Sequence, residues 1–194
     1  FKGAENANIR IGDTVVVFAQ GPIGLCATAG ARLLGATTII AVDGNDHRLG
    51  IAQKMGADVT LNFKNCDVID EIMKSTGGRG ADSAIEALGT QATFESALRC
   101  IKPGGTLSSL GVYSEDLKIP LSAFAAGLGD HKINTALCPG GKERMRRLMN
   151  VLASNRLDLG LLVTHQYKLD DIVAAYDLFA HQRDGVLKVA ITPQ

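Results

Sequence analysis

The sequence has no surplus of charge in either direction: 20 Lys and Arg balance 20 Asp and Glu, for a formal net charge of zero. A chain without a basic surplus lacks the electrostatic footprint of a nucleic-acid-binding protein, and it has no general attraction to anionic membranes. No apolar run approaches the roughly 20 residues that a membrane-spanning helix needs. We therefore expect a small-molecule ligand, with no nucleic-acid partner and no membrane.

Cysteine motifs are also missing. The four cysteines, Cys26, Cys66, Cys100 and Cys138, form no C-x-x-C pair and have no histidine at zinc-finger spacing. This spacing argues against structural zinc and favours reduced, buried thiols in a cytoplasmic protein. The chain has no initiator Met and opens with the end of a helix leading into a strand. We therefore expect it to be a piece of a longer protein.

What the sequence does contain is a regular alternation of strand and helix patterns. Strands are predicted at 14–19, 37–43, 59–63, 83–88, 106–112 and 132–137, with helices at 23–35, 47–57, 68–76, 91–101 and near 120–127. Helical crossovers impose parallel pairing, and right-handed connections produce a doubly wound sheet. The predicted fold is α/β, a six-stranded parallel Rossmann sheet over 1–141. Residues 142–194 form an α+β tail with helices at 142–157 and 169–182 and strands at 161–169 and 185–193.

A glycine turn follows the first predicted strand in the segment AQGPIG, residues 19–24. The dinucleotide-binding pattern G-x-G-x-x-G has Ala19 in place of its first glycine, while Gly21 and Gly24 remain. Alanine is tolerated at the bend if its φ is negative, because only a positive φ penalises a Cβ strongly. Pro22 suits a first helical turn, and the free N–H groups of Ile23 and Gly24 can face an anion.

An acidic residue supports a dinucleotide. Asp43 ends the second predicted strand, 19 residues after Gly24. A carboxylate there can accept both ribose hydroxyls of the adenosine half and would repel a 2′-phosphate, which favours NAD over NADP. A solvated loop carboxylate or a helix N-cap is the simpler alternative.

Four segments together resemble the zinc-dependent medium-chain alcohol dehydrogenases, with secondary alcohol dehydrogenases as the nearest subgroup: AQGPIGLCATAGARLLGA, ADSAIEALG, IKPGGTLSSLGVYS and LCPGGKERMRRLM. The resemblance runs in order along essentially the whole chain. It implies that 1–141 is the NAD-binding domain and that 142–194 would complete a catalytic domain whose zinc-carrying part precedes Phe1. It also implies an oligomer, a dimer or a tetramer, which pairs through the predicted strand 132–137.

The resemblance also implies cofactor contacts along the chain. The glycine turn would face the pyrophosphate, the Asp43 region and Phe63 the adenosine, and the ends of the fourth and fifth strands the nicotinamide, while Lys188 would approach the pyrophosphate. The predicted cofactor-binding residues are Gly21, Pro22, Ile23, Gly24, Asp43, Gly44, Asn45, Arg48, Phe63, Ala87, Leu88, Gly89, Leu110, Gly111, Val112 and Lys188.

One departure from the family decides the predicted cofactor. The NADP-using secondary alcohol dehydrogenases place a small neutral residue, serine and arginine where this chain has Asp43, Gly44 and Asn45. A 2′-phosphate would thus meet a carboxylate and no arginine, so NAD is predicted. Within the chain His47, His131, His165 and His181 form no ligand set with a cysteine. We therefore expect zinc only in the part of the enzyme outside this chain, no catalytic or metal residue within it, and no alcohol oxidation by the chain alone.

Three other functions share parts of this pattern. A methyltransferase also uses a glycine turn and an acid after the second strand, but it needs no close third glycine such as Gly24. A non-enzymatic NAD-sensing module would fit a fragment, although no DNA-binding helix pair is visible. A zinc-free quinone oxidoreductase of the same superfamily differs mainly in the part that precedes Phe1, so these residues leave it open.

Overall fold

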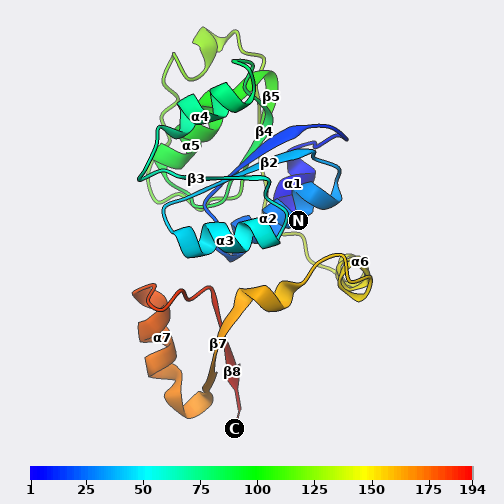
Figure 1. The fold of residues 1–194 in the computed structure, drawn as a ribbon, viewed down its shortest axis with the longest axis vertical. Coiled ribbons are helices and arrows are strands. Elements are labelled where there is room, and N and C mark those ends of the chain that lie inside the picture. Colours follow the sequence, from blue (N-terminus) through cyan, green and yellow to red (C-terminus); the bar gives the residue numbers. More distant parts are fainter. Residues whose placement is uncertain (194) are drawn as a thin grey trace. The chain divides into compact units, whose positions relative to one another are not determined.

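The computed structural model describes residues 1–193 and divides into two compact units, Phe1–Pro139 and a second unit that begins at Gly140. The first unit holds a six-stranded, all-parallel sheet in the order β3-β2-β1-β4-β5-β6 (Figure 1). The predicted doubly wound α/β fold is confirmed. The strands are β1 Thr14–Phe18, β2 Thr38–Asp43, β3 Val59–Asn62, β4 Ala81–Glu86, β5 Ile101–Ser109 and β6 Lys132–Thr135.

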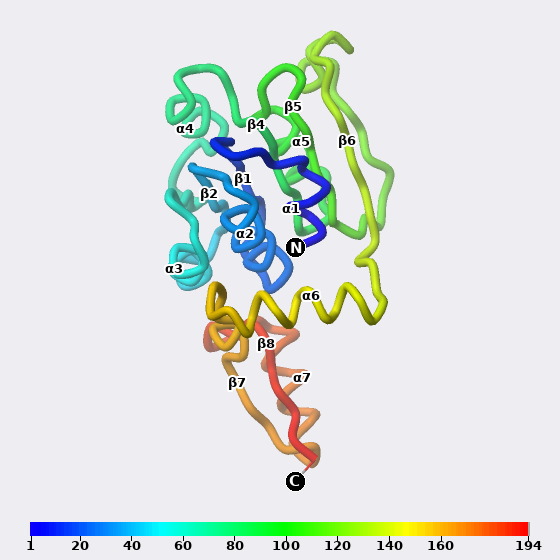
Figure 2. The backbone as a smooth tube through the Cα atoms, turned by 90° about the vertical axis from the view of Figure 1, so that its right-hand side faces the viewer, coloured from blue at the N-terminus to red at the C-terminus, as the bar shows by residue number. Residues whose placement is uncertain are grey.

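Helices cover both faces of this sheet, as Figure 2 lets the reader follow along the backbone. On β1, Val16 and Phe18 pack into a core cluster with Ile72 of α4 and Phe94 of α5. Because side chains alternate along a strand, Val15 and Val17 point to the opposite face, where α2 packs on β1. The helices are α1 Lys2–Asn6, α2 Pro22–Leu33, α3 Asp46–Lys54, α4 Val68–Ser75 and α5 Gln91–Arg99.

Burial on both faces explains the strand sequences. The TVVVF of β1 and the TIIAVD of β2 are runs of β-branched residues that are buried from their second residue onward. Such continuous apolar runs are typical of parallel strands sandwiched between helices. The order places a switch point between β1 and β4, where the connections run in opposite directions. Open α/β sheets bind their ligands at the carboxyl ends of the strands beside such a point.

Several predicted element boundaries are wrong. The helix expected near 120–127 is only a 3₁₀ turn, Ala125–Gly127, because Ala125 and Ala126 take positive φ values of 47° and 54°. Residues 102–105, which the sequence leaves between a predicted helix and a predicted strand, lie within β5, where its pairing with β4 shifts register between Ile101 and Thr106. Strands β4 and β5 end at Glu86 and Ser109, earlier than predicted, so the site residues of these segments lie in the turns that follow.

The second unit is a small α/β assembly. Strands β7 Val163–Lys168 and β8 Lys188–Thr192 form a parallel pair, joined by α7 Ile172–Ala180 and preceded by α6 Lys142–Ala153. Val173, Tyr176 and Phe179 of α7 are exposed. In the described part of the chain, none of the helices has the length and apolar character needed to cross a membrane.

Candidate functional site: a glycine turn and two strand ends

The turn between β1 and α2 is built around an alanine with left-handed backbone. Ala19 has a φ of 68°, so the negative φ under which an alanine is readily tolerated at the bend is not found. This conformation costs an L-residue with a Cβ roughly 1–2 kcal/mol. The Ala19 N–H donates to the carbonyl of Val42 on the neighbouring strand at 2.9 Å, and this bond ties the bend to the end of β2.

The two remaining glycines have different roles. A Cβ at Gly24 would lie 1.7 Å from the Ala19 carbonyl oxygen, so only glycine lets α2 start this close to the turn. A Cβ at Gly21 would meet nothing within 4 Å, and Gly21 has an unstrained φ of −72°. The protein itself therefore does not require glycine at 21. The open space over Gly21, at the N-terminus of α2 with Pro22 in its first turn, suits an anionic ligand that approaches the backbone closely.

A buried glutamine, Gln20, fixes the turn, although it was not among the predicted site residues. Gln20 is fully buried; its side-chain amide donates to the Val17 carbonyl at 2.8 Å and accepts from the Thr28 hydroxyl at 3.0 Å. The two bonds link the end of β1 to the second turn of α2. The one available signal was a long polar residue within an otherwise apolar glycine turn.

Asp43 faces the same turn. Its Oδ2 accepts from the Gln20 N–H at 2.6 Å and its Oδ1 from the Asn45 N–H at 2.9 Å, and the residue is only 8% exposed. Two backbone donors thus fix the carboxylate between the end of β2 and the glycine turn. Since an ionised carboxylate accepts about four hydrogen bonds, it keeps capacity for a ligand diol.

The other residues predicted at the adenosine end gather around Asp43. Asn45 caps α3 by accepting from the N–H groups of His47 and Arg48, at 2.9 and 3.3 Å. A Cβ at Gly44 would lie 2.4 Å from the ring of Phe63, so the glycine lets that ring approach the backbone next to Asp43. Phe63 remains 57% exposed, which leaves a face of the ring open to a planar ligand.

The strand ends across the switch point hold the remaining residues of the first unit. The Ala87 N–H donates to the Phe18 carbonyl at 3.1 Å, and the Leu110 N–H to the Glu86 carbonyl at 2.8 Å. Gly89 has a φ of 96°, and a Cβ at Gly111 would lie 2.3 Å from its Cα. The turns after β4 and β5 are therefore in backbone contact, which only glycines permit.

Under these two turns lies a carboxylate that the sequence analysis also missed. Glu86, fully buried, ends β4 and accepts from the N–H groups of Leu88 and Gly89, both at 2.8 Å. The Tyr113 hydroxyl also donates to it, at 2.7 Å. Burial and the nearby carboxylate raise the pKa of Tyr113, while its bond to Ser109 opposes the rise. A glutamate at the end of a buried strand was the available signal.

Lys188 is the one predicted residue outside this arrangement. It is exposed and opens β8 in the second unit. Its approach to a pyrophosphate stays a prediction. In residues 1–193, no three or more His, Cys, Asp and Glu side chains are grouped as a metal ion would require.

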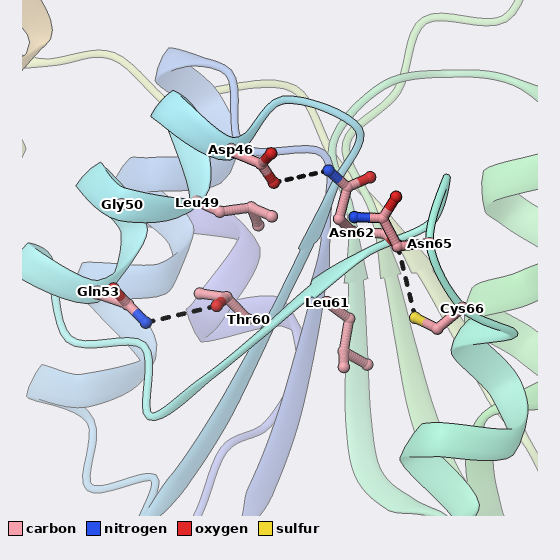
Figure 3. A pocket seen from close by; sticks show the side chains of 9 residues that line it. All are labelled: Asp46, Leu49, Gly50, Gln53, Thr60, Leu61, Asn62, Asn65 and Cys66. Atoms are coloured by element: carbon pink, nitrogen blue, oxygen red, sulfur yellow. Dashed lines mark hydrogen bonds between the residues drawn. The ribbon is translucent and has the colours of Figure 1, made fainter.

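A cavity of about 380 Å³ lies to one side of the glycine turn, between α3 and β3 (Figure 3). Its polar side chains bond to one another: Asn62 donates to Asp46 at 2.7 Å and Gln53 to Thr60 at 3.4 Å. None of the residues predicted to bind cofactor lines it. The lining residues are Asp46, Leu49, Gly50, Gln53, Thr60, Leu61, Asn62, Asn65 and Cys66.

A doubly wound sheet with a glycine turn, an acid after β2 and interlocked glycines after β4 and β5 defines a dinucleotide-binding type of fold. The family model for zinc-binding dehydrogenases matches residues 22–154. The chain belongs to this family, as the sequence resemblance predicted.

Relatives of known name support the assignment. An alcohol dehydrogenase of Cupriavidus necator is 85% identical over 193 residues, which cover 100% of this chain and 53% of that protein. An NADP-dependent isopropanol dehydrogenase of Entamoeba histolytica is 37% identical, over 98% of this chain and 53% of the relative. Among solved structures, alcohol dehydrogenase TADH from Thermus sp. ATN1 superposes with a TM-score of 0.89 at 30% identity, covering 99% of this chain and 54% of that one. The chain thus spans about half the length of these relatives.

Proposed function

We propose that this chain is the cofactor-binding part of a zinc-dependent alcohol dehydrogenase that transfers hydride between NAD and secondary alcohols or ketones. The names of the 85% and 37% identical relatives support an alcohol substrate. In this proposal residues 1–141 bind the pyridine nucleotide and residues 142–194 complete a catalytic domain. A zinc ion, held outside this chain, would polarise the substrate oxygen.

The residues of this chain bind and orient the nucleotide. The open space over Gly21 receives the pyrophosphate at the N-terminus of α2, and the ring of Phe63 lies against the adenine. The turns after β4 and β5 carry the nicotinamide half across the switch point. The chain needs no acid or base of its own for this work, because the reactive atoms belong to cofactor and substrate.

The observation that carries the choice of NAD is the position of Asp43. Its carboxylate is buried, faces the glycine turn and is fixed by two backbone N–H groups. A ribose diol can donate to its free lone pairs, whereas a 2′-phosphate would bring a second negative charge against it. The isopropanol dehydrogenase of Entamoeba histolytica is named as NADP-dependent. With the proposed preference for NAD, this chain would differ from that relative in its cofactor.

Titration of the purified protein with NADH and NADPH tests the proposal, with nicotinamide fluorescence as the readout. We expect NADH to bind at least tenfold more tightly than NADPH, and Asp43→Asn to remove most of this preference. Asp46→Asn is the matched control, because Asp46 lies three residues away and bonds to Asn62 instead. Equal affinity of the wild type for both cofactors, or an unchanged preference in Asp43→Asn, would contradict the role of Asp43.

We further propose that copies of the protein associate through the edge strand β6. This strand pairs with β5 on one side, and its four residues are half-buried or exposed. An unpaired strand edge is a template for another strand. Light scattering measures the molar mass of the wild type and of an Ile133→Pro variant in solution. We expect the wild type to be a dimer or a tetramer and the variant to dissociate.

A further inference from the structure

Glu86 is a buried carboxylate whose partners are all neutral. Its Oε1 accepts from Leu88 N–H, Gly89 N–H and the Thr93 hydroxyl, each at 2.8 Å, and its Oε2 accepts from the Tyr113 hydroxyl at 2.7 Å. The two N–H groups can only donate. Two N–H groups that can only donate, together with two hydroxyl groups in position to donate, are partners that suit the ionised carboxylate.

The four donors come from the segments that form the two turns of the site. Leu88 and Gly89 lie in the turn after β4, Thr93 in the first turn of α5 and Tyr113 after β5. A Cβ at Gly111 would lie 2.5 Å from Glu86 Oε2 and 2.3 Å from the Cα of Gly89, so the turns meet directly over the carboxylate. Glu86 therefore sets how the turns lie relative to one another.

A buried charge without a counterion also acts on what binds above it. Electrostatic interactions are stronger at partly buried sites than in water, and the hydrogen bonds of Glu86 are to neutral groups that spread its charge but do not cancel it. The nicotinamide ring carries a positive charge in NAD⁺ and none in NADH. A nearby carboxylate thus favours the oxidised cofactor.

We propose that Glu86 is a positioning residue for the nicotinamide half of the cofactor, which shapes the turns 87–89 and 110–113 and biases the site toward the oxidised ring. The inference rests on the proposed nucleotide binding. It assigns Glu86 no contact with substrate and no proton transfer.

The central variant is Glu86→Gln. Its amide oxygen can accept from Leu88, Gly89 and Thr93, and its NH₂ can donate to the Tyr113 oxygen while that hydroxyl turns to Ser109, 2.7 Å away. The variant thus keeps the shape and removes the charge. We expect the dissociation constant of ADP-ribose, which lacks the nicotinamide, to stay within twofold, and NAD⁺ to weaken about tenfold relative to NADH, by isothermal titration calorimetry.

Thr93→Val separates position from charge. It removes one neutral donor from Oε1 and leaves the carboxylate. We expect NAD⁺ and NADH to weaken together by about threefold, with ADP-ribose unchanged. This variant decides the positioning role if Glu86→Gln shows no cooperative thermal transition.

Asp82→Asn is the matched control at the other end of the same strand. Asp82 is largely buried and accepts from Thr14 N–H at 2.8 Å and from Lys102. Its substitution should lower thermal stability without changing the ratio of NAD⁺ to NADH affinity. A shifted ratio in Asp82→Asn would show that any lost acidic residue of β4 has this effect, and would overturn the proposal.

Two further results would overturn it. One is a ratio of NAD⁺ to NADH affinity in Glu86→Gln that stays within twofold of the wild-type ratio. The other is an equal loss of all three ligands in Glu86→Gln or Thr93→Val, since that would indicate a general structural role. If the wild type binds none of the three ligands, the proposed nucleotide binding itself fails, which is a different outcome.

Discussion

The carbonyl oxygen of Ala19 occupies the space that a side chain at Gly24 would need, 1.7 Å from the Cβ position. The opening turn of α2 and the bend after β1 therefore exclude any other residue at 24. Gly21, three residues earlier, borders open space. Gly24 thus permits close packing within the protein, whereas Gly21 leaves room for a ligand.

Gly24→Ala and Gly21→Ala should consequently fail in different ways. We expect Gly24→Ala to lose at least about 3 kcal/mol of unfolding free energy, because backbone must move to relieve the overlap. Gly21→Ala should stay within about 1 kcal/mol of the wild type, since its φ is ordinary, but bind NADH at least tenfold more weakly. Urea denaturation and NADH titration measure both. If a folded Gly21→Ala variant bound NADH as tightly as the wild type, the proposed pyrophosphate site at this turn would be contradicted.

The strained Ala19 predicts a stabilising substitution. Ala19→Gly relieves a left-handed conformation worth roughly 1–2 kcal/mol and increases the entropy of the unfolded chain by somewhat less, so we expect a gain of about 0.5–1 kcal/mol. Ala92→Gly, at an exposed position of α5 with ordinary helical backbone, is the control and should lose about 1 kcal/mol. Destabilisation of both variants to the same extent would contradict the strain at Ala19.

Asp82 makes the stability of the first unit depend on pH. Burial by itself would raise the pKa of Asp82, but hydrogen bonds from Lys102 and the Thr14 N–H, with the charges of Lys102 and Arg79, hold it below its usual value. A carboxyl group whose pKa is lower in the folded state than in the unfolded chain stabilises the fold at pH values above its unfolded pKa of ~4. This stabilisation is lost as the pH falls through the folded-state pKa. Asp82→Asn should therefore cost about 1–2 kcal/mol at pH 7, with the difference from wild type shrinking between pH 4 and pH 2. A difference that is constant with pH would refute this account.

The cysteines should differ in reactivity. Burial raises the pKa of the Cys100 thiol, whereas Cys138 is exposed after β6. Since the thiolate is the reactive form, iodoacetamide should label Cys138 within minutes and leave Cys100 unmodified until the protein is denatured. Peptide mass spectrometry separates the two sites. Labelling of Cys100 at the rate of Cys138 in native protein would show that β5 is not packed as described.

Much of the fold and half of the site were predictable from local sequence. The β-branched runs of β1 and β2 and the helical periodicities between strands indicate a parallel sheet covered on both faces, because helices on both faces bury such continuous apolar runs. Gly21, Gly24 and Asp43 stand at spacings that the dinucleotide turn dictates, so the sequence alone pointed to them. The helix expected near 120–127 shows the limit, since backbone at Ala125 and Ala126 leaves the helical region within an apolar stretch.

The sequence by itself determined the order of strands and helices, the strand ends at which a ligand is expected and the family. Only the tertiary structure decided the positive φ of Ala19 and the hydrogen bonds of the Gln20 side chain. It also decided that four hydrogen-bonding groups surround Glu86. These features depend on the spacing between segments up to 27 residues apart along the chain. Local propensities carry no information on such distances, because they are set by how the strands and helices pack.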